Sequence, residues 1–417
     1  MLLRWKFLHC YRDPFLTPMA RDLDASPTQI AAALTTAILI AAALAPAAGR
    51  WLDARGGRGL MTAGSILAVV AVLAWSRVES VWQLYATFAA IGVSCAMVLY
   101  EAAFAVIVAW YGSDQKSRAG ALLALTIVAG FASAIFIPLT GLLVDAYGWR
   151  QALIALALLY GLSAIPLHLF VLRRPAVAHT PAAAENRAEI FQAAVRRRPF
   201  WLLVIAFTAN GGAVATIAVV LVTYLIHLGH SPVLAATLAG LLGVLSVTGR
   251  LITTGLQTRL PAALIAAAIF SLQGVAALLL PVVGRSAAGA IGCVLAFGLG
   301  FGIASITLPH LLVARYGTAA YATLSGRIAV FSVADKALAP LGAVALAQVV
   351  GYPPVMAAVA AVCAIAAGAL VTYHPHIIRF TSNQGVVSWP LPQALSAARR
   401  SPASRSPRPT RRRQRCC

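Results

Sequence analysis

Charged residues are scarce in this chain, and acids are scarcer than bases. Of its 417 residues, 10% are Asp, Glu, Lys or Arg, with 11 acids against 32 bases. A water-soluble surface carries far more charge than this. The length alone would suggest two or three soluble domains. The apolar content of 61% and the mean hydropathy of +0.86 exclude that class of protein.

Motifs for enzymatic chemistry are missing as well. The sequence has no glycine-rich nucleotide-binding loop and no serine nucleophile motif followed by a paired His and Asp. The six cysteines show neither metal-ligand spacing nor a disulfide framework, and Cys416 and Cys417 are adjacent. We therefore expect no enzyme, no ATP-driven step, and no metal or cofactor.

The formal net charge of +21 would suit a nucleic-acid partner, but the placement of the bases argues against one. Nine of the 32 lie after Tyr373, and most others lie in short loops between apolar runs. This asymmetry is typical of cytoplasmic loops that face anionic lipid. We expect a lipid bilayer as the partner and no nucleic acid.

Apolar stretches of about 20 residues recur along the chain, and each is long enough to cross the hydrocarbon core as a helix. This pattern predicts an all-α polytopic membrane protein. Eleven membrane spans are predicted at Pro27–Ala48, Leu60–Trp75, Gln83–Trp110, Gly120–Val144, Ala152–Leu172, Phe200–Leu228, Val233–Leu256, Ala262–Val283, Ala287–Ala314, Ala322–Val350 and Val355–Tyr373.

A twelfth span would precede these eleven. The segment before Asp22 contains charges and two prolines, so it predicts either a truncated or replaced first span upstream of Phe15, or a short tilted helix whose basic residues snorkel. Twelve spans give two six-helix bundles, at residues 1–172 and 200–373. A charged linker at 173–199 joins them, and a disordered basic tail follows at 374–417.

Counting Lys and Arg loop by loop predicts the orientation. The loops around Arg50–Arg58, Lys116–Arg118, Arg173–Arg198 and Arg250–Arg259 carry most of the charge. These loops should be cytoplasmic, and with twelve spans both termini lie on the same side. We expect an integral protein of the plasma (inner) membrane.

One loop organises the first bundle: Gly49 to Gly59, with the sequence GRWLDARGGRG, between the second and third spans. It resembles the signature loop of the major facilitator superfamily of secondary transporters. In that loop Gly, three residues, Asp, a basic residue and Gly precede further basic residues. The matching residues are Gly49, Asp53, Arg55, Gly56 and Arg58, with the first basic residue one place later because Ala54 follows Asp53.

A second, incomplete copy of this pattern in the other half of the chain supports the resemblance. Gly49-Arg50 is repeated as Gly249-Arg250, and Trp110-Tyr111-Gly112 as Arg315-Tyr316-Gly317. Pro138-Leu139 is likewise repeated as Pro340-Leu341. Parallel six-helix halves joined by a charged loop are what this superfamily looks like. The resemblance extends, more loosely, to bacterial sugar-efflux and monocarboxylate-type permeases.

The loop also suggests a gate. The eleventh span should begin near Ala322 at the cytoplasmic face, where its first N–H groups lack partners and carry a partial positive charge. Asp53 is expected to accept from those groups when that face is closed. The resemblance implies the same contact, with Arg55 or Arg58 pairing acids on adjacent helices. The simpler interpretation is a loop whose charges merely fix the topology.

Ionisable residues inside spans are costly and are candidates for function. Glu101, after Tyr100 in the fourth span, lies ten residues from Tyr111 and therefore about 15 Å deep, near the midplane. Such a carboxylate suits proton coupling, although a structural hydrogen bond would explain it too. Asp335 and Lys336 lie in the middle of the eleventh span. Adjacent residues differ by about 100° on a helix, so the two should not face one cavity squarely.

Two further pathway candidates are weaker. His310 follows Pro309 in the tenth span and is more simply a hydrogen-bonding spacer. Asn210, before Gly211-Gly212, marks a point where the seventh span can unwind towards a solute or pack closely against another helix. At the other membrane face, Asp145 and Arg150 of the segment around Gly148 are expected to form an outer gate or a helix-end clamp.

These features together predict a secondary active transporter that moves a small organic solute by alternating access, with protons as the coupling ion, acting as a monomer. The alternative is a transport-incompetent remnant, or a membrane sensor that keeps the transporter fold.

Overall fold

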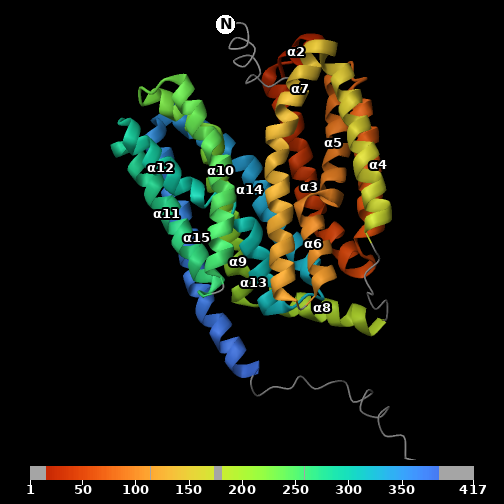
Figure 1. Cartoon of the computed structure of the whole chain (residues 1–417), viewed down its shortest axis with the longest axis vertical. Coiled ribbons are helices and arrows are strands. Elements are labelled where there is room, and N and C mark those ends of the chain that lie inside the picture. Colours follow the sequence, from red (N-terminus) through yellow and green to blue (C-terminus); the bar gives the residue numbers. More distant parts are fainter. Residues whose placement is uncertain (1–15, 113, 173–180, 258, 385–417) are drawn as a thin grey trace, which may run out of the picture. The chain divides into compact units, whose positions relative to one another are not determined.

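The computed structural model describes residues 16–112, 114–172, 181–257 and 259–384. Within these ranges all regular elements are helices (Figure 1). The described residues from Leu16 to His376 belong to one compact unit. The predicted first span upstream of Phe15 lies outside the described residues, and so does most of the predicted tail.

The first bundle is built from α2 to α7. Ser26 caps α3 through a reciprocal pair of bonds with Gln29, which satisfies N–H groups at the start of the predicted second span. Gly56, with φ of 76°, ends α3 and allows α4 to begin at once. The helices are α2 (Leu16–Asp22), α3 (Pro27–Arg55), α4 (Gly57–Trp75), α5 (Val81–Val98), α6 (Tyr100–Tyr111) and α7 (Gln115–Pro166), followed by the π-helix η1 (Leu167–Val171).

The long helix α7 contains two predicted spans. At Gly148 its backbone leaves the helical region, with φ of 79°, and the chain turns back on itself (Figure 1). The predicted fifth and sixth spans therefore lie on either side of this glycine. By length and composition, ten helical segments in the described part of the chain could cross a membrane.

The second bundle follows a helical linker. The linker helix α8 crosses the lower end of Figure 1. The helices are α8 (Pro181–Val195), α9 (Arg198–His227), α10 (Pro232–Leu256), α11 (Ala262–Val283), α12 (Ala287–Leu299), α13 (Ala304–Tyr316), α14 (Tyr321–Val350) and α15 (Tyr352–Gln384). The last helix continues past Tyr373, the predicted end of the final span.

The fourth and tenth spans are each broken into two helices. Leu99 is extended between α5 and α6, and residues 300–303 separate α12 from α13. A break of this kind frees backbone carbonyls within the membrane, where they need a partner from the protein. Gly112 ends α6 and Gly317 ends α13, both at positive φ and 205 positions apart.

The same separation relates the Ser-Pro pairs that open α3 and α10, at residues 26 and 231. The predicted match of Gly49 with Gly249, 200 positions apart, is out of this register and is wrong. Gly49 packs against α14 of the opposite bundle, whereas Gly249 packs against Leu299 of its own bundle.

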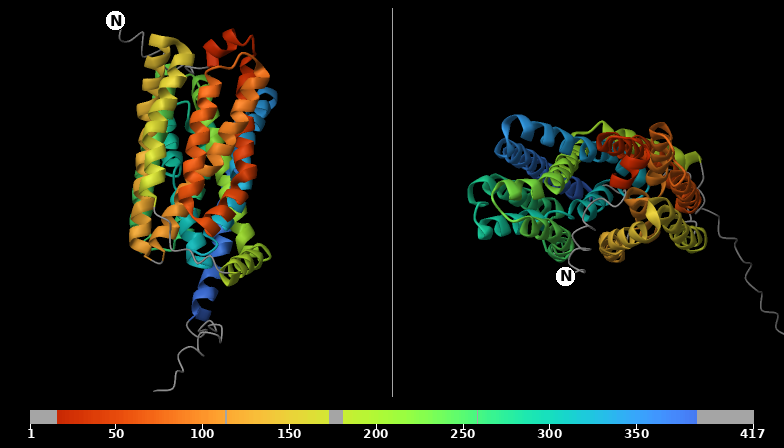
Figure 2. Two further views of the ribbon diagram at one scale, coloured as in Figure 1. Left: turned by 90° about the vertical axis from the view of Figure 1, so that its right-hand side faces the viewer. Right: turned by 90° about the horizontal axis from the view of Figure 1, so that it is seen from above.

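We name the two ends of the bundles after the predicted orientation. The inner end carries α8 and the Gly56 turn, and the outer end carries α2 and the Gly148 turn. At the outer end each bundle has its own hydrophobic core, one including Phe88 and Trp149 and the other including Tyr224 and Phe297. Neither cluster takes a residue from the other bundle. Figure 2 shows the two groups of helices from the side and from above.

Candidate gate and solute pathway

The inner ends of the bundles are joined by Asp53 of α3. Its Oδ1 accepts a hydrogen bond from the backbone N–H of Ala322 at 3.0 Å. Its Oδ2 accepts from the backbone N–H and the hydroxyl of Thr323, both at 2.7 Å. Ala322 and Thr323 begin α14, so the carboxylate satisfies N–H groups that the helix itself leaves without partners. The predicted contact is present in the structure.

Two glycines allow the helices to approach this closely. A Cβ at Gly49 would lie 2.2 Å from the carbonyl oxygen of Ala322, and a Cβ at Gly326 would lie 2.5 Å from that of Ala45. Neither distance leaves room for a methyl group. The backbone of α3 and that of α14 are therefore in direct contact at the inner end.

The arginines of the loop have different partners from those expected. The guanidinium of Arg55 lies over the ring of Trp51, 4.3 Å from its centroid. In the described part of the chain neither Arg55 nor Arg58 has an acid within ion-pair distance, so the predicted pairing is wrong. The cation that interacts electrostatically with Asp53 is Arg187 of the linker helix α8.

Arg250 makes a second connection between the bundles. Its Nη1 donates to the carbonyl oxygen of Thr126 in α7 at 2.8 Å, and its Nε donates to that of Gly302 at 3.2 Å. Gly302 lies in the break between α12 and α13, so Arg250 satisfies one of the carbonyls which that break exposes. Both acceptors are neutral, and a guanidinium has five N–H donors. Donors therefore remain for a further acceptor.

Arg250 lies within α10, which ends at Leu256 as the predicted span does. The loop-by-loop charge count nevertheless placed Arg250 with the cytoplasmic loop residues. Its place inside the predicted span already marked it as an ionisable residue in a membrane helix.

Tyr100 and Glu101 open α6, directly after the break at Leu99. Glu101 is half-buried and interacts electrostatically with Tyr321, the first residue of α14. Tyr100 is 41% exposed and interacts electrostatically with Arg250. The hydroxyl of Tyr100 and the carboxylate of Glu101 in the fourth span therefore interact with residues of the second bundle.

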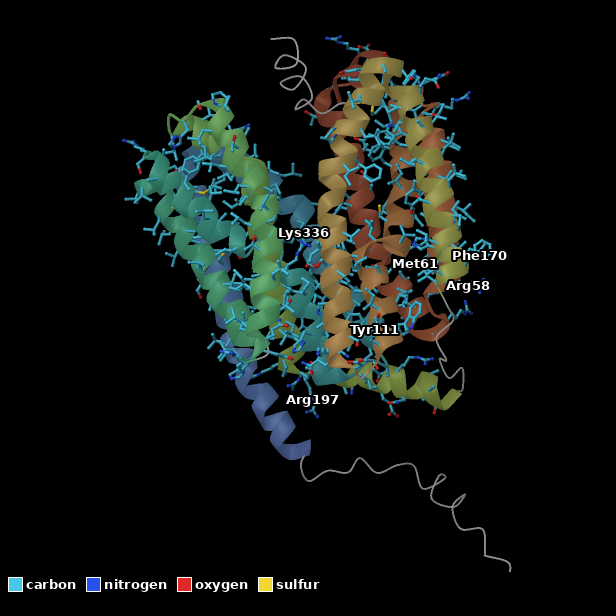
Figure 3. All side chains as sticks on the ribbon, in the orientation of Figure 1. Arg58, Met61, Tyr111, Phe170, Arg197 and Lys336 are labelled. Atoms are coloured by element: carbon cyan, nitrogen blue, oxygen red, sulfur yellow. The ribbon has the colours of Figure 1, made fainter. Side chains whose placement is uncertain are left out.

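Asp335 and Lys336 lie on different sides of a close contact between α9 and α14. A Cβ at Gly212 would meet the Asp335 carboxylate, and one at Gly211 would meet the side chain of Lys336. Asp335 lines a cavity inside the second bundle. Lys336 is exposed, and Figure 3 shows it between the two bundles.

Asn210 does not face a solute pathway. Helix α9 is regular throughout, and Asn210 is 1% exposed. Its Nδ2 donates to Gln273 Oε1 at 2.9 Å, and Gln273 Nε2 donates to the carbonyl of Phe297 at 3.1 Å. This buried network supports the end of α12 before its break. Local unwinding at Gly211-Gly212 is therefore wrong, and close packing is right.

His310 on α13 is half-buried and interacts electrostatically with Arg118 near the start of α7. The described residues bring together no group of three His, Cys, Asp or Glu side chains, and none is assigned to a metal.

The outer-end residues form a clamp within the first bundle. Arg150 Nη1 donates to the carbonyls of Ser76 at 3.1 Å and Val78 at 2.9 Å, and its Nε lies 3.8 Å from Asp22. Trp149 Nε1 donates to the same carboxylate at 2.8 Å. Asp145 is exposed. Because these partners all belong to one bundle, they support the helix-end clamp and not an outer gate.

Arg150→Ala should therefore lower stability without changing the gate. The variant loses two charge-assisted bonds to carbonyls that end α4, in a partly exposed setting, so we expect a loss of about 1–2 kcal/mol. Thermal unfolding in detergent measures it, with the exposed Arg77→Ala as the control. A change in the distance between spin labels on the two bundles, with stability unaltered, would show that Arg150 gates instead.

The two helical bundles are joined at the inner end and have separate hydrophobic cores at the outer end. This arrangement is typical of membrane transport proteins built from two bundles. A family model described as Major Facilitator Superfamily matches residues 13–334. The chain belongs to this superfamily.

Solved structures of similar fold agree. The human organic anion transporter MFSD10 (TETRAN) superposes with a TM-score of 0.61 at 18% identity, over 82% of this chain and 83% of that one. A variant of the Escherichia coli fucose:proton symporter FucP gives 0.63 at 16% identity, over 88% and 95%. At these identities the likeness concerns the fold. The comparison with curated proteins gives no match.

Proposed function

We propose that this chain is a secondary active transporter that moves a small organic solute across the plasma membrane by alternating access, in its outward-facing state here. One observation carries the proposal. The bundles are joined at the inner end by Asp53, while each keeps an independent core at the outer end. When the inner contacts break, this outward-facing arrangement exchanges with an inward-facing one.

The charges between the bundles favour an anionic solute. Arg250 retains unused donors, and Lys336 is an exposed cation. A solute carboxylate is a stronger acceptor than the neutral carbonyls that Arg250 now contacts. One protein of similar fold, MFSD10, is named as an organic anion transporter, which agrees with this choice. The cation-rich loops favour a cytoplasmic inner end with both termini on that side, and the proposed working unit is the monomer.

The experiment is uptake into proteoliposomes that contain the purified protein, with and without an inward proton gradient. Radiolabelled monocarboxylates, dicarboxylates and sugars are the probes. Gradient-driven accumulation of one acid and no accumulation of sugars supports the proposal. Binding of an acid without any flux, under either gradient, supports the alternative of a membrane sensor or a transport-incompetent remnant.

Glu101 is the proposed proton carrier, since it is a half-buried carboxylate inside the fourth span, beside α14. The other protein of similar fold, FucP, is named as a fucose:proton symporter. Glu101→Gln keeps the shape and removes the titration. We expect accumulation to fall to equilibrium, a loss of about tenfold for one proton across one pH unit, while exchange of labelled for unlabelled solute continues.

Glu79→Gln is the matched control, since it removes an exposed carboxylate in the loop before α5. It should accumulate solute like the parent protein. Persistent accumulation by Glu101→Gln would assign coupling to another residue.

A further inference from the structure

A cavity of about 650 Å³ lies within the second bundle, between α9, α14 and α15. Its wall is almost entirely apolar and rich in small residues, including Gly212 and Gly342. Because Asp53 contacts the start of α14, the cavity and the inner gate share one helix. None of the residues assigned to the proposed anion pathway, Arg250, Lys336 or Glu101, lines the cavity.

A few polar groups interrupt the apolar wall, and Asp335 and Thr208 are two of them. Asp335 is the one ionisable side chain among the described lining residues. Lys336 and the backbone of Gly212 both interact with Asp335 electrostatically, and Lys336 does not lie at ion-pair distance from it. The hydroxyl of Thr208, also in the wall, is buried without a hydrogen-bond partner. A buried hydroxyl without a partner can form a hydrogen bond with a polar group of a ligand.

An aromatic pair completes the site. Trp201 and Phe331 line the same cavity, with ring centroids 6.0 Å apart and planes at 67°. Phe331 lies one helical turn before Asp335, on the same side of α14. Arg327 lies over Phe331, 5.7 Å from its centroid, and Trp201 is the second aromatic ring in the wall. Carboxylate, free hydroxyl and aromatic faces within an apolar wall are the groups that recognise an organic ammonium.

We propose that this cavity is a binding site for lipophilic amines, distinct from the anion pathway. The ammonium group donates to Asp335 and to Thr208, and the hydrocarbon part fills the apolar length of the cavity. The carboxylate sets the sign of the ligand, since a neutral or anionic amphiphile of equal length gains no charge-assisted bond there.

Equilibrium binding of tritiated N,N-dimethyldodecylamine to the full chain in lipid nanodiscs tests the site. Dodecanol is the neutral competitor and dodecanoate the anionic one. We expect the amine to bind at least about tenfold more tightly than either, given the strength of hydrogen bonds to charged groups. Asp335→Asn should bring amine binding down to the level of dodecanol, and Thr208→Val should weaken it severalfold.

Two control variants locate the site. Asp145→Asn removes an exposed carboxylate at the outer end and should leave binding unchanged. A Cβ at Gly342 meets no atom within 4 Å, so Gly342→Leu fills the cavity without a clash and should abolish binding of the amine. Gly368→Leu, equally unhindered and outside the cavity wall, should not.

Equal binding of amine and dodecanol, or an Asp335→Asn variant with parental affinity, would overturn the proposal and leave a groove for lipid acyl chains. Retained binding in Gly342→Leu would place the amine elsewhere. None of these measurements requires transport. Failure of the amine site and failure of the proposed transport function are therefore separate results.

Discussion

Asp53→Asn should open the inner end. The parent carboxylate accepts three hydrogen bonds from the start of α14, and all three are weakened when the charge is removed. A charge at a partly buried helix end contributes about 1–2 kcal/mol, so we expect the inward-open population to rise about tenfold. Direct contact of α3 with α14 at Gly49 and Gly326 should remain possible, since the backbone is unchanged.

A cysteine reports the opening. Ser325 is 6% exposed near the start of α14, and Ser325→Cys is nearly isosteric. In a background without the natural cysteines, its rate of reaction with a membrane-permeant maleimide should rise about tenfold in Asp53→Asn. Thr323→Val, which removes only the hydroxyl bond, should raise the rate by less.

Asp114→Asn is the matched control. Asp114 caps α7 at the same end, and hydrogen bonds from the side chain and backbone of Ser117 hold the pKa of its carboxyl below the usual range, so it is ionised at neutral pH. This variant deletes the same charge from the same membrane face without touching α14. If Asp53→Asn reacts no faster than Asp114→Asn and transports normally, the loop fixes topology alone.

The Asp53 contact was predictable from the sequence, because span length and loop charge depend on the bilayer and not on the packing partner. The turn at Gly56 and the start of α14 therefore had to lie at one face. The midplane depth of Glu101, counted from Tyr111, stays a prediction.

Orientation around each helix was not predictable. In a bilayer the outer face of a span is as apolar as its packed face, so periodicity does not say which way Asn210 points. The buried amide network with Gln273 depends on α11 and α12, far away in the sequence. The sequence could not assign Arg150 to the clamp, because its partners, Asp22 and the end of α4, are far from it in the sequence.

The role of Arg250 was not predictable either. The predicted span at residues 233–256 includes it, and an arginine inside a span is tolerated when backbone carbonyls accept from it. One of these carbonyls belongs to a break at residues 300–303 that no local pattern predicts. The linker cation Arg187 near Asp53 was missed for a related reason, since nothing in the sequence brings α8 to the gate.

Arg250→Gln should cause the largest loss of solute binding. The guanidinium donates to the carbonyls of Thr126 and Gly302 and has further N–H groups that are unused. In the proposed mechanism these N–H groups donate to the solute carboxylate. Removing one partner of a desolvated charge pair costs about 2–5 kcal/mol, so affinity for the transported acid should fall by at least about 30-fold. Arg250→Lys keeps the charge but lacks the fork and should recover part of the affinity.

Arg50→Gln is the control, since Arg50 also follows a glycine, in the signature loop, but is exposed. It should bind the acid like the parent. The Ser325→Cys reporter adds a second reading of Arg250→Gln. Loss of the bond to Thr126 removes a link between α10 and α7, so maleimide reaction at the inner end should accelerate even without solute. Unchanged affinity together with faster reaction would make Arg250 a latch and assign the acid to Lys336.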